Sequence, residues 1–333
     1  MNVSILGAGG WGTTLAILLK HNGHNVTLWE YSHSYANEIA LSRDNKIYLP
    51  GITIPKEILI TYSLEECCYN KDMIVLAVPT QFIRSVLISL KGYDFKTTTF
   101  VSVAKGIEKD TLMTVSHIIR NEIKNIASNQ IGVLSGPSHA EEVARKVPTA
   151  VVAASHDPFV AKQIQSTFMT SYFRIYSTTD ILGVEYGGAL KNVIAIGAGI
   201  IDGAKFGDNT KAAIMTRGIA EIARLGIALG ANPETFSGLS GMGDLIVTCM
   251  SKHSRNRFVG EEIGKGKKLK EILKNMQMIA EGVETCRSVH QLSLKHQIET
   301  PIASAVYKIL FEEQDPTMVT YELMTRDMKA EDE

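Results

Sequence analysis

The chain has 333 residues, of which 45% are apolar and 21% are charged, and its formal net charge at pH 7 is −1. A single hydrophobic core rarely grows this large, so the length predicts two domains, and the composition excludes the disordered, collagen-like and disulfide-rich classes. The near-neutral charge excludes a broad electrostatic surface for nucleic acid, so any anionic partner is expected to be a small molecule.

Short runs rich in β-branched residues alternate with amphipathic segments in the first half of the chain, which indicates βαβ units feeding a parallel sheet. After about Thr179 the strand pattern disappears, and helical patterns broken by Gly, Asn and Pro follow. We therefore predict an α/β fold, with a Rossmann-like doubly wound sheet over 1–180 and an all-α domain over 181–333. The expected strands are 2–6, 25–29, 73–78, 99–103, 131–135, 149–154 and 172–176. The expected helices are 11–21, two long ones within 183–230 separated by a turn at 203–209, and 255–264, 283–296, 302–313 and 316–325.

The first predicted strand runs into a glycine-rich turn, GAGGWG, which opens a helix. Gly7 permits the tight turn, Gly9 lets backbone amides approach a ligand, and Gly12 lets the helix pack closely on the strand. The helix N-terminus adds partial positive charge. The turn, including Gly10 and Trp11, is therefore expected to hold the pyrophosphate of NAD or NADP.

An acidic residue, Glu30, ends the second predicted strand, 18 residues after Gly12 and near the position that binds the ribose hydroxyls of adenosine. Its charge repels a 2′-phosphate, and no arginine between 30 and 42 receives one, although His33 offers a weaker contact. This favours NAD, unless Glu30 points to solvent. Pro79, after the strand 73–78, either touches the cofactor or only ends the strand.

Two polar segments follow later strands. Lys105 comes directly after the strand 99–103, between small residues, and is expected to project into the crevice rather than lie on the surface. In SGPSHAEE, residues 135–142, Ser138 is expected to cap a helix with Glu141 as its capping-box partner. The amides of the same turn can also receive the anionic end of a substrate.

Lys191 lies on the most apolar predicted helix and is followed by Asn192. Loss of hydration disfavours the charged form of a buried lysine, which lowers its pKa from about 10.4 toward neutrality. Such a lysine can take a proton from an alcohol and return it to a carbonyl oxygen. The alternative is a lysine whose ammonium reaches solvent from a buried helix.

The stretch from Gly241 to Arg257 combines chemistry-bearing residues between predicted helices. Arg255 has the planar fork that binds phosphate, Asn256 can donate to another phosphate oxygen, and Asp244 could orient a lysine or a substrate hydroxyl. The alternative is a solvated loop rich in Ser and Arg.

Other features predict little chemistry. Cys67, Cys68, Cys249 and Cys286 lack metal-ligand spacing, so we expect structural thiols and no metal; the vicinal pair is interpreted as one buried and one exposed thiol, with a redox disulfide as the alternative. The apolar run around 193–201 is too short for a membrane span and predicts a buried helix. No export signal precedes the first predicted strand, so a cytoplasmic location is expected.

Seven motifs occur in one order along the chain: GAGGWGTTLA, NKIYLPGI at 45–52, VAKGIE, LSGPSHAEE, GVEYGGALKNVIAIGAGIIDG at 183–203, GMGDLIVTC and SRNR. From Val3 to about Leu310 their order and spacing resemble the bacterial NAD(P)-dependent glycerol-3-phosphate dehydrogenase family. The resemblance implies a helical domain like that of 6-phosphogluconate dehydrogenase, a homodimer, and reversible hydride transfer between the nicotinamide and dihydroxyacetone phosphate or sn-glycerol 3-phosphate. This reaction would supply glycerol 3-phosphate for phospholipid synthesis.

The resemblance also implies roles for individual residues, with Lys191 as the proton acceptor. Substrate contacts would come from Lys105, Gly136, Ser138, Asp244, Ser254, Arg255 and Asn256, with Thr248 near the phosphate. The cofactor would be lined by Trp11, Lys105, Ala140, Arg255, Ile279 and Glu281.

Two positions depart from the family. Gly10 stands where a serine is usual, and Glu30 with Tyr31 stands where many members carry a basic residue, which puts a preference for NADP in doubt. Two other functions are weighed: a β-hydroxyacid dehydrogenase of the 6-phosphogluconate type, and a nicotinamide sensor without catalysis. A carboxylate substrate would need different anchors, and a sensor has no need of the lysines.

Overall fold

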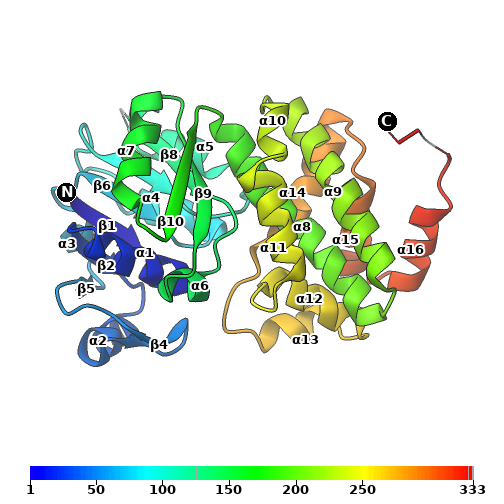
Figure 1. Cartoon of the computed structure of the whole chain (residues 1–333), viewed down its shortest axis with the longest axis horizontal. Coiled ribbons are helices and arrows are strands. Elements are labelled where there is room, and N and C mark those ends of the chain that lie inside the picture. Colours follow the sequence, from blue (N-terminus) through cyan, green and yellow to red (C-terminus); the bar gives the residue numbers. More distant parts are fainter. Residues whose placement is uncertain (125, 329, 332–333) are drawn as a thin grey trace.

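The computed structural model describes residues 1–124, 126–328 and 330–331, with a sheet-containing half beside a helical half (Figure 1). The strands are β1 (Asn2–Leu6), β2 (Asn25–Trp29), β3 (Asp44–Asn45), β4 (Leu49–Thr53), β5 (Leu59–Thr61), β6 (Met73–Leu76), β7 (Thr99–Ser102), β8 (Ile131–Ser135), β9 (Thr149–Ala154) and β10 (Phe173–Thr178). The helices of the first half are α1 (Gly10–His21), α2 (His33–Ser42), α3 (Leu64–Cys68), α4 (Thr80–Ile88), α5 (Val115–Glu122), the short 3-10 helix η1 (Ser128–Gln130), α6 (Ala140–Ala144) and α7 (Pro158–Phe168). Those of the second half are α8 (Ile181–Ala204), α9 (Asp208–Ala228), α10 (Pro233–Phe236), the π-helix η2 (Leu239–Gly243), α11 (Asp244–Met250), α12 (Arg255–Gly264), α13 (Leu269–Lys274), α14 (Glu281–His296), α15 (Pro301–Phe311) and α16 (Pro316–Met324).

Eight strands form one sheet in the order β10-β9-β8-β7-β6-β1-β2-β5, while β3 pairs with β4 in a separate hairpin. Strand β1 lies parallel between β2 and β6, with Ile5 opposite both Leu28 and Val75. The order therefore reverses beside β1, where open α/β sheets bind their ligands. All seven predicted strands are present, and the α/β fold class is confirmed. The short strands β3, β4 and β5 were not predicted.

The expectation of a parallel sheet is wrong for its last two strands, because β9 runs antiparallel to β8 and β10 runs parallel to β9. The reason lies in the connection between β8 and β9. Its helix α6 has five residues and spans about 8 Å, whereas β8 is about 17 Å long. This helix is too short to return the chain along the sheet, so β9 starts where β8 ends.

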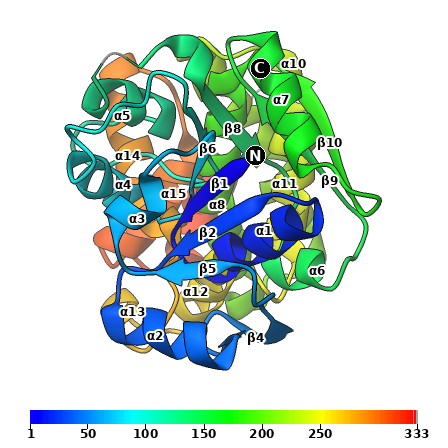
Figure 2. The ribbon, with the colours of Figure 1, turned by 90° about the vertical axis from the view of Figure 1, so that its left-hand side faces the viewer.

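Helices cover both faces of the sheet (Figure 2). Helices α1, α6 and α7 bury their apolar sides on one face, and α3, α4 and α5 do so on the other. The residues of α3 include Cys67 and Cys68, which are both buried and both free thiols. The expectation of one exposed thiol is therefore wrong, because this short helix turns both side chains inward against the sheet.

Helix α8 forms the centre of the second half and contacts α9, α11, α12, α14 and α15. It is long and apolar enough to cross a membrane, but the whole apolar window is buried inside the protein, as expected for a core helix. Its closest neighbour is α12: a Cβ on Gly199 would lie 2.0 Å from the carbonyl oxygen of Arg257, and one on Gly260 would lie 1.9 Å from that of Ile196. Glycines thus allow the two backbones to touch.

The helices expected in the second half are all present, with ends that differ by at most two residues. The interpretation of 241–249 as a segment between helices is wrong, because η2 and α11 occupy it. Leu245, Thr248 and Cys249 follow helical spacing and bury one side of α11. The boundary proposed between 180 and 181 falls between β10 and α8.

Two carboxylates from the helical half bind helix N-termini of the sheet half. The carboxylate of Glu185 accepts hydrogen bonds from the backbone N and Oγ of Ser116 in α5, at 2.8 and 2.6 Å. Glu281 accepts two hydrogen bonds from Thr80 at the start of α4, through the backbone N and Oγ1, both at 2.8 Å. Unpaired N–H groups at a helix N-terminus need such acceptors. These contacts join the two halves of the chain.

Candidate active site

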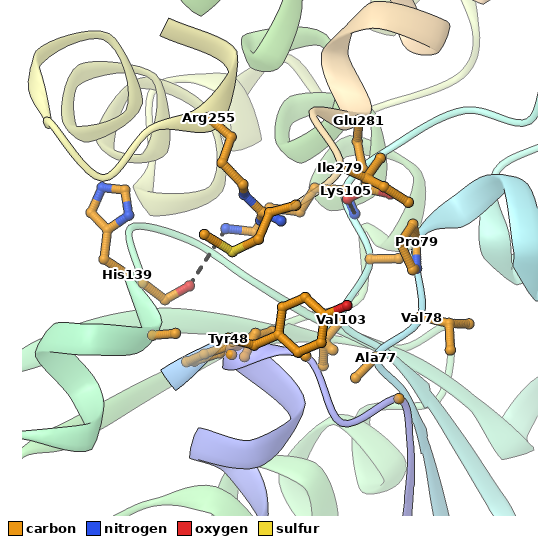
Figure 3. A pocket seen from close by; sticks show the side chains of 18 of the residues that line it. Tyr48, Ala77, Val78, Pro79, Val103, Lys105, His139, Arg255, Ile279 and Glu281 are labelled. Carbon is orange, nitrogen blue, oxygen red and sulfur yellow. Dashed lines mark hydrogen bonds between the residues drawn. The ribbon is translucent and has the colours of Figure 1, made fainter. Parts of the chain in front are cut away.

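A cavity of about 350 Å³ lies between the glycine-rich turn, the ends of β6 and β7, and helices α8, α11 and α12 (Figure 3). This volume is in the range of small-molecule sites. The predicted site residues that line it are Gly7, Gly9, Gly10, Trp11, Glu30, Pro79, Lys105, Ser138, Ala140, Lys191, Asn192, Asp244, Thr248, Ser254, Arg255, Asn256, Ile279 and Glu281. The other two, Gly12 and Gly136, do not line it; Gly12 lies in α1, and the backbone oxygen of Gly136 accepts a hydrogen bond from Nζ of Lys105 at 2.8 Å.

The glycine-rich turn has no room for side chains at three of its glycines. Gly7 has a φ of 116°, and a Cβ on Gly12 would lie 2.0 Å from the carbonyl oxygen of Gly7. A Cβ on Gly10 would lie 2.6 Å from the carbonyl oxygen of Tyr48, so a serine would clash with the backbone here. Nothing lies within 4 Å of the Cβ position of Gly9. The turn therefore leaves open space before the N-terminus of α1, which fits a pyrophosphate group.

Asp244 holds two lysines together at the floor of the cavity. Its Oδ1 accepts a hydrogen bond from Nζ of Lys191 at 3.0 Å, and its Oδ2 accepts one from Nζ of Lys105 at 2.8 Å. Lys191 also donates to Oγ1 of Thr248 at 2.5 Å, and this hydroxyl donates to the backbone oxygen of Asp244 at 2.6 Å. Lys105 comes from the sheet half and the other three from the helical half, so the constellation spans both.

Burial and charge set the proton affinities of this group. Burial lowers the pKa of Lys191 to about 8; the carboxylate of Asp244 opposes this effect, and the ammonium of Lys105 adds to it. Burial would raise the pKa of Asp244, but the two lysines outweigh it, so the pKa lies below its ordinary value. Near neutral pH, Asp244 is therefore ionised while Lys191 can exchange a proton. The alternative of a solvent-reaching lysine is wrong, because Lys191 is only 5% exposed.

The loop between β8 and α6 receives Lys105. The ammonium donates to the backbone oxygen of Gly136 at 2.8 Å and lies 3.5 Å from Oγ of Ser138. The sequence predicted Ser138 as the N-cap of α6, and this prediction is wrong. The N-cap is His139, whose side chain makes no capping hydrogen bond. The helix starts one residue later than predicted, and the Ser138 hydroxyl instead donates to Gly136 at 2.9 Å.

A chain of amides lies behind Lys191. Asn192 donates to the backbone oxygen of Lys105 at 2.8 Å and accepts from Nδ2 of Asn256 at 2.9 Å. Oδ1 of Asn256 in turn accepts from the backbone N of Gly282 at 2.9 Å. Both asparagines are buried, and both side chains are partly engaged within the protein. They fix the position of the loop that carries Lys105 as well as lining the cavity.

In the SRNR segment, Ser254 and Arg257 are engaged in contacts within the protein, whereas the side chain of Arg255 is available to bind a ligand. Oγ of Ser254 caps α12 by accepting from the backbone N of Arg257 at 3.1 Å, and Arg257 is paired with Asp202 at 2.7 Å. Arg255 is exposed at the cavity, and its side chain has no hydrogen bond or ion pair with any described residue. Its guanidinium is therefore free to bind an anion, as Figure 3 shows by its position over the cavity.

Residues expected to contact the cofactor lie around the same cavity. Oε1 of Glu30 accepts from the backbone N of Ser32 at 3.0 Å, and partial burial raises the pKa of this carboxyl. Glu281 is tied to Thr80 and also accepts from the backbone N of Lys105 at 3.2 Å. Pro79 and Ile279 both line the cavity and lie at its right-hand side in the view of Figure 3.

Several lining residues were missed, among them Tyr48, His139, His253, Gln277 and Met278. Tyr48 belongs to the NKIYLPGI motif, whose position in the sequence gave no sign of contact with the glycine turn. The other four flank predicted residues within one or two positions, which was the available signal. No group of three or more His, Cys, Asp or Glu side chains among the described residues is arranged to hold a metal ion.

Comparisons with known proteins cover both halves. The family models for NAD-dependent glycerol-3-phosphate dehydrogenase match residues 2–161 with the N-terminal part and 180–321 with the C-terminal part. A glycerol-3-phosphate dehydrogenase [NAD(P)+] of Thermoanaerobacter sp. is 52% identical over 331 residues, covering 99% of both chains. The corresponding protein of Chlorobium phaeobacteroides is 49% identical, with the same coverage.

Solved structures agree. The crystal structure of glycerol-3-phosphate dehydrogenase from Coxiella burnetii has a TM-score of 0.93 at 35% identity and covers 98% of this chain and 99% of its own. A D-mandelate dehydrogenase with NADH, at 14% identity and a TM-score of 0.64, shares only the fold. On these matches over nearly its whole length, the chain belongs to the NAD-dependent glycerol-3-phosphate dehydrogenase family.

Proposed function

We propose that this protein interconverts dihydroxyacetone phosphate and sn-glycerol 3-phosphate with a nicotinamide cofactor. The observation that carries the proposal is the buried group of Lys191, Asp244 and Lys105 in one cavity with the glycine-rich turn and the unpaired Arg255. A base, an anion-binding guanidinium and a dinucleotide site are the parts that a phosphorylated alcohol and its ketone require. The names of the full-length relatives, glycerol-3-phosphate dehydrogenase [NAD(P)+], support glycerol 3-phosphate as the alcohol and a nicotinamide as the cofactor.

The residues present fit the cofactor, since the turn leaves open space beside Gly9 at the N-terminus of α1. When bound, the nicotinamide supplies or accepts the hydride exchanged with C2 of the substrate. Neutral Lys191 takes the proton of the C2 hydroxyl during oxidation, and its ammonium returns a proton to the carbonyl oxygen during reduction. Asp244 and Thr248 orient the Lys191 amine through their hydrogen bonds.

The remaining site residues position the substrate. Arg255 binds the phosphate with its planar fork, and the donors of Asn256 lie beside it. Lys105 supplies a second cation close to the reacting carbons, held by Gly136 and Asp244. Ser138 and Ser254 complete the substrate side, while Trp11, Ala140, Ile279 and Glu281 complete the cofactor side.

The substrate assignment is tested by comparing the oxidation of NADH by dihydroxyacetone phosphate with its oxidation by 3-oxo acids. We expect activity with the phosphate only. Preference for a 3-oxo acid would instead identify a β-hydroxyacid dehydrogenase, and NADH binding without turnover of any substrate would identify a sensor. Replacing Lys191 by alanine should abolish turnover and leave NADH binding intact.

We also propose NAD as the preferred cofactor, because the Glu30 carboxylate at the cavity repels a 2′-phosphate and would bind ribose hydroxyls. Titrations with NADH and NADPH in steady state should give a lower KM for NADH. Replacing Glu30 by glutamine should narrow the difference by improving the KM for NADPH. Equal KM values for the two cofactors in the native protein would contradict the proposal.

The family resemblance further supports a cytoplasmic homodimer that supplies glycerol 3-phosphate for phospholipid synthesis. Light scattering of the purified protein tests the dimer, and cell fractionation tests the location. Restoration of growth in a glycerol 3-phosphate auxotroph tests the supply of this metabolite.

A further inference from the structure

The NKIYLPGI motif forms the β3–β4 hairpin, residues 44–53, which the proposed reaction leaves without a role. Asn45 fixes this hairpin to the glycine-rich turn and is fully buried. Its Nδ2 donates to the backbone oxygen of Ala8 at 2.7 Å and to Oγ1 of Thr13 at 2.8 Å. Its Oδ1 accepts from the hydroxyl of Tyr35 at 2.6 Å and from the backbone N of Tyr48 at 3.2 Å. One side chain thus binds the turn and the hairpin together.

The hairpin lies against the middle of the glycine-rich turn. The carbonyl oxygen of Tyr48 is 2.6 Å, and the Cβ of Ala140 is 3.6 Å, from the position of a Cβ on Gly10. Gly10 begins α1, at the place where a pyrophosphate would bind. Tyr48 is therefore next to the middle of a bound dinucleotide, away from both Glu30 at the adenosine end and Lys191 at the reacting end.

The Tyr48 side chain lines the cavity. Figure 3 shows it on the sheet side, opposite Arg255 and Ile279. Its ring stands edge-on to that of Tyr35, with ring centres 5.9 Å apart and planes at 81°. The Tyr35 hydroxyl also accepts from the backbone N of Ile47 at 3.1 Å, so Tyr35 supports the hairpin from below. The Tyr48 hydroxyl, by contrast, has no hydrogen bond with any described residue.

We propose that Tyr48 is a cofactor-binding residue whose hydroxyl donates a hydrogen bond to the pyrophosphate, and that Asn45 and Tyr35 are positioning residues that hold it there. A phenol hydroxyl is a good donor to a phosphate oxygen, and a rigid hairpin lowers the entropy lost when the contact forms. The inference rests on the proposed use of a nicotinamide dinucleotide, but not on the identity of the substrate.

The test measures the dissociation constants of NADH and ADP-ribose, without substrate, for the native protein and for Tyr48→Phe. Loss of one hydrogen bond should raise both constants by the same factor, about fivefold, with little change in the KM for dihydroxyacetone phosphate. The matched control is Tyr321→Phe, because Tyr321 is exposed on α16 and does not line the cavity. This control should bind NADH as the native protein does.

Each other result decides against a stated part of the proposal. Unchanged NADH affinity in Tyr48→Phe overturns it, whereas a native protein that fails to bind NADH refutes the proposed function itself. Weaker binding of NADH but not of ADP-ribose would move the contact to the nicotinamide and overturn the pyrophosphate assignment. A change confined to the KM for dihydroxyacetone phosphate would make Tyr48 a substrate residue.

The positioning role has its own readout. Tyr35→Phe should weaken NADH binding in the native background but add little in the Tyr48→Phe background, because Tyr35 acts through Tyr48. Full additivity of the two substitutions would show that Tyr35 acts independently and would refute its positioning role. Both variants keep the aromatic ring, so each removes only a hydroxyl; in Tyr35→Phe this is the hydroxyl that donates to Asn45 and accepts from the backbone N of Ile47.

Discussion

The proton affinity of Lys191 makes the two directions of the reaction respond to pH in opposite senses. With a pKa of about 8, roughly one tenth of Lys191 is neutral at pH 7 and roughly nine tenths at pH 9. Oxidation of glycerol 3-phosphate needs the neutral amine, so its kcat/KM should rise about tenfold between these pH values. Reduction of dihydroxyacetone phosphate needs the ammonium, so its kcat/KM should fall by a similar factor.

Initial rates followed by NADH absorbance in both directions measure this effect. The range from pH 7 to 9 lies above the second ionisation of a phosphate monoester, near pH 6, so the charge of the substrate stays nearly constant. Asp244→Asn is the matched perturbation, because the carboxylate raises the pKa of Lys191; its removal should move both profiles to lower pH. Flat profiles, parallel changes in both directions, or a move to higher pH in Asp244→Asn would refute the role of Lys191.

Three other predictions follow from the geometry. Arg255→Ala should raise the KM for dihydroxyacetone phosphate about 10- to 100-fold without lowering Tm, whereas Arg257→Ala, which breaks the pair with Asp202, should lower Tm with little effect on KM; an unchanged KM in Arg255→Ala would contradict the phosphate assignment. Gly10→Ser should weaken NADH binding, as measured by fluorescence titration, because its Cβ would meet the Tyr48 carbonyl; tighter binding would show that the turn has more room than the structure gives it. Burial raises the pKa of Glu221 to about 7, so this group's contribution to stability is present below pH 4.5 and is lost as the pH rises to 7, by an amount on the order of 3 kcal/mol; the Tm of Glu221→Gln relative to native should therefore be higher at pH 8 than at pH 5, and a difference of the opposite sign would refute the buried carboxyl.

The regular parts of the fold were predictable because their signals are local. The seven predicted strands are short runs rich in apolar and β-branched residues, and the long helices α8 and α9 are separated by a clear Gly and Asn turn. The strands β3 and β5 have two and three residues, too few to show a period, and Pro50 and Gly51 interrupt the apolar pattern of β4. The direction of β9 depends on the length of α6. This helix has only five residues, and so short a segment has no clear helical pattern from which its length could be predicted.

In the candidate site, too, the features with a local sequence signal were predicted and those without one were not. Residues with a chemical reason to be unusual in their context, such as Lys191 on an apolar helix, were found from the sequence, and the structure brings Lys191 together with Lys105 and Asp244. The ion pair between Lys105 and Asp244 joins residues 139 positions apart, and no local pattern encodes such a contact. Tyr48 was missed for the same reason, since only the tertiary structure brings its hairpin onto the glycine turn.

The carboxylates of Glu185 and Glu281 also bear on how the protein can be divided. Each carboxylate accepts hydrogen bonds from the N-terminus of a helix in the other half. Residues 1–180 expressed alone would therefore lack these acceptors for the backbone N–H groups at the start of α4 and α5. A chimaera that joins this helical half to a foreign dinucleotide-binding half would need a hydroxyl residue at the positions of both Thr80 and Ser116, to donate hydrogen bonds to Glu281 and Glu185. We therefore expect either half, separated from the other, to lose these hydrogen bonds across the interface.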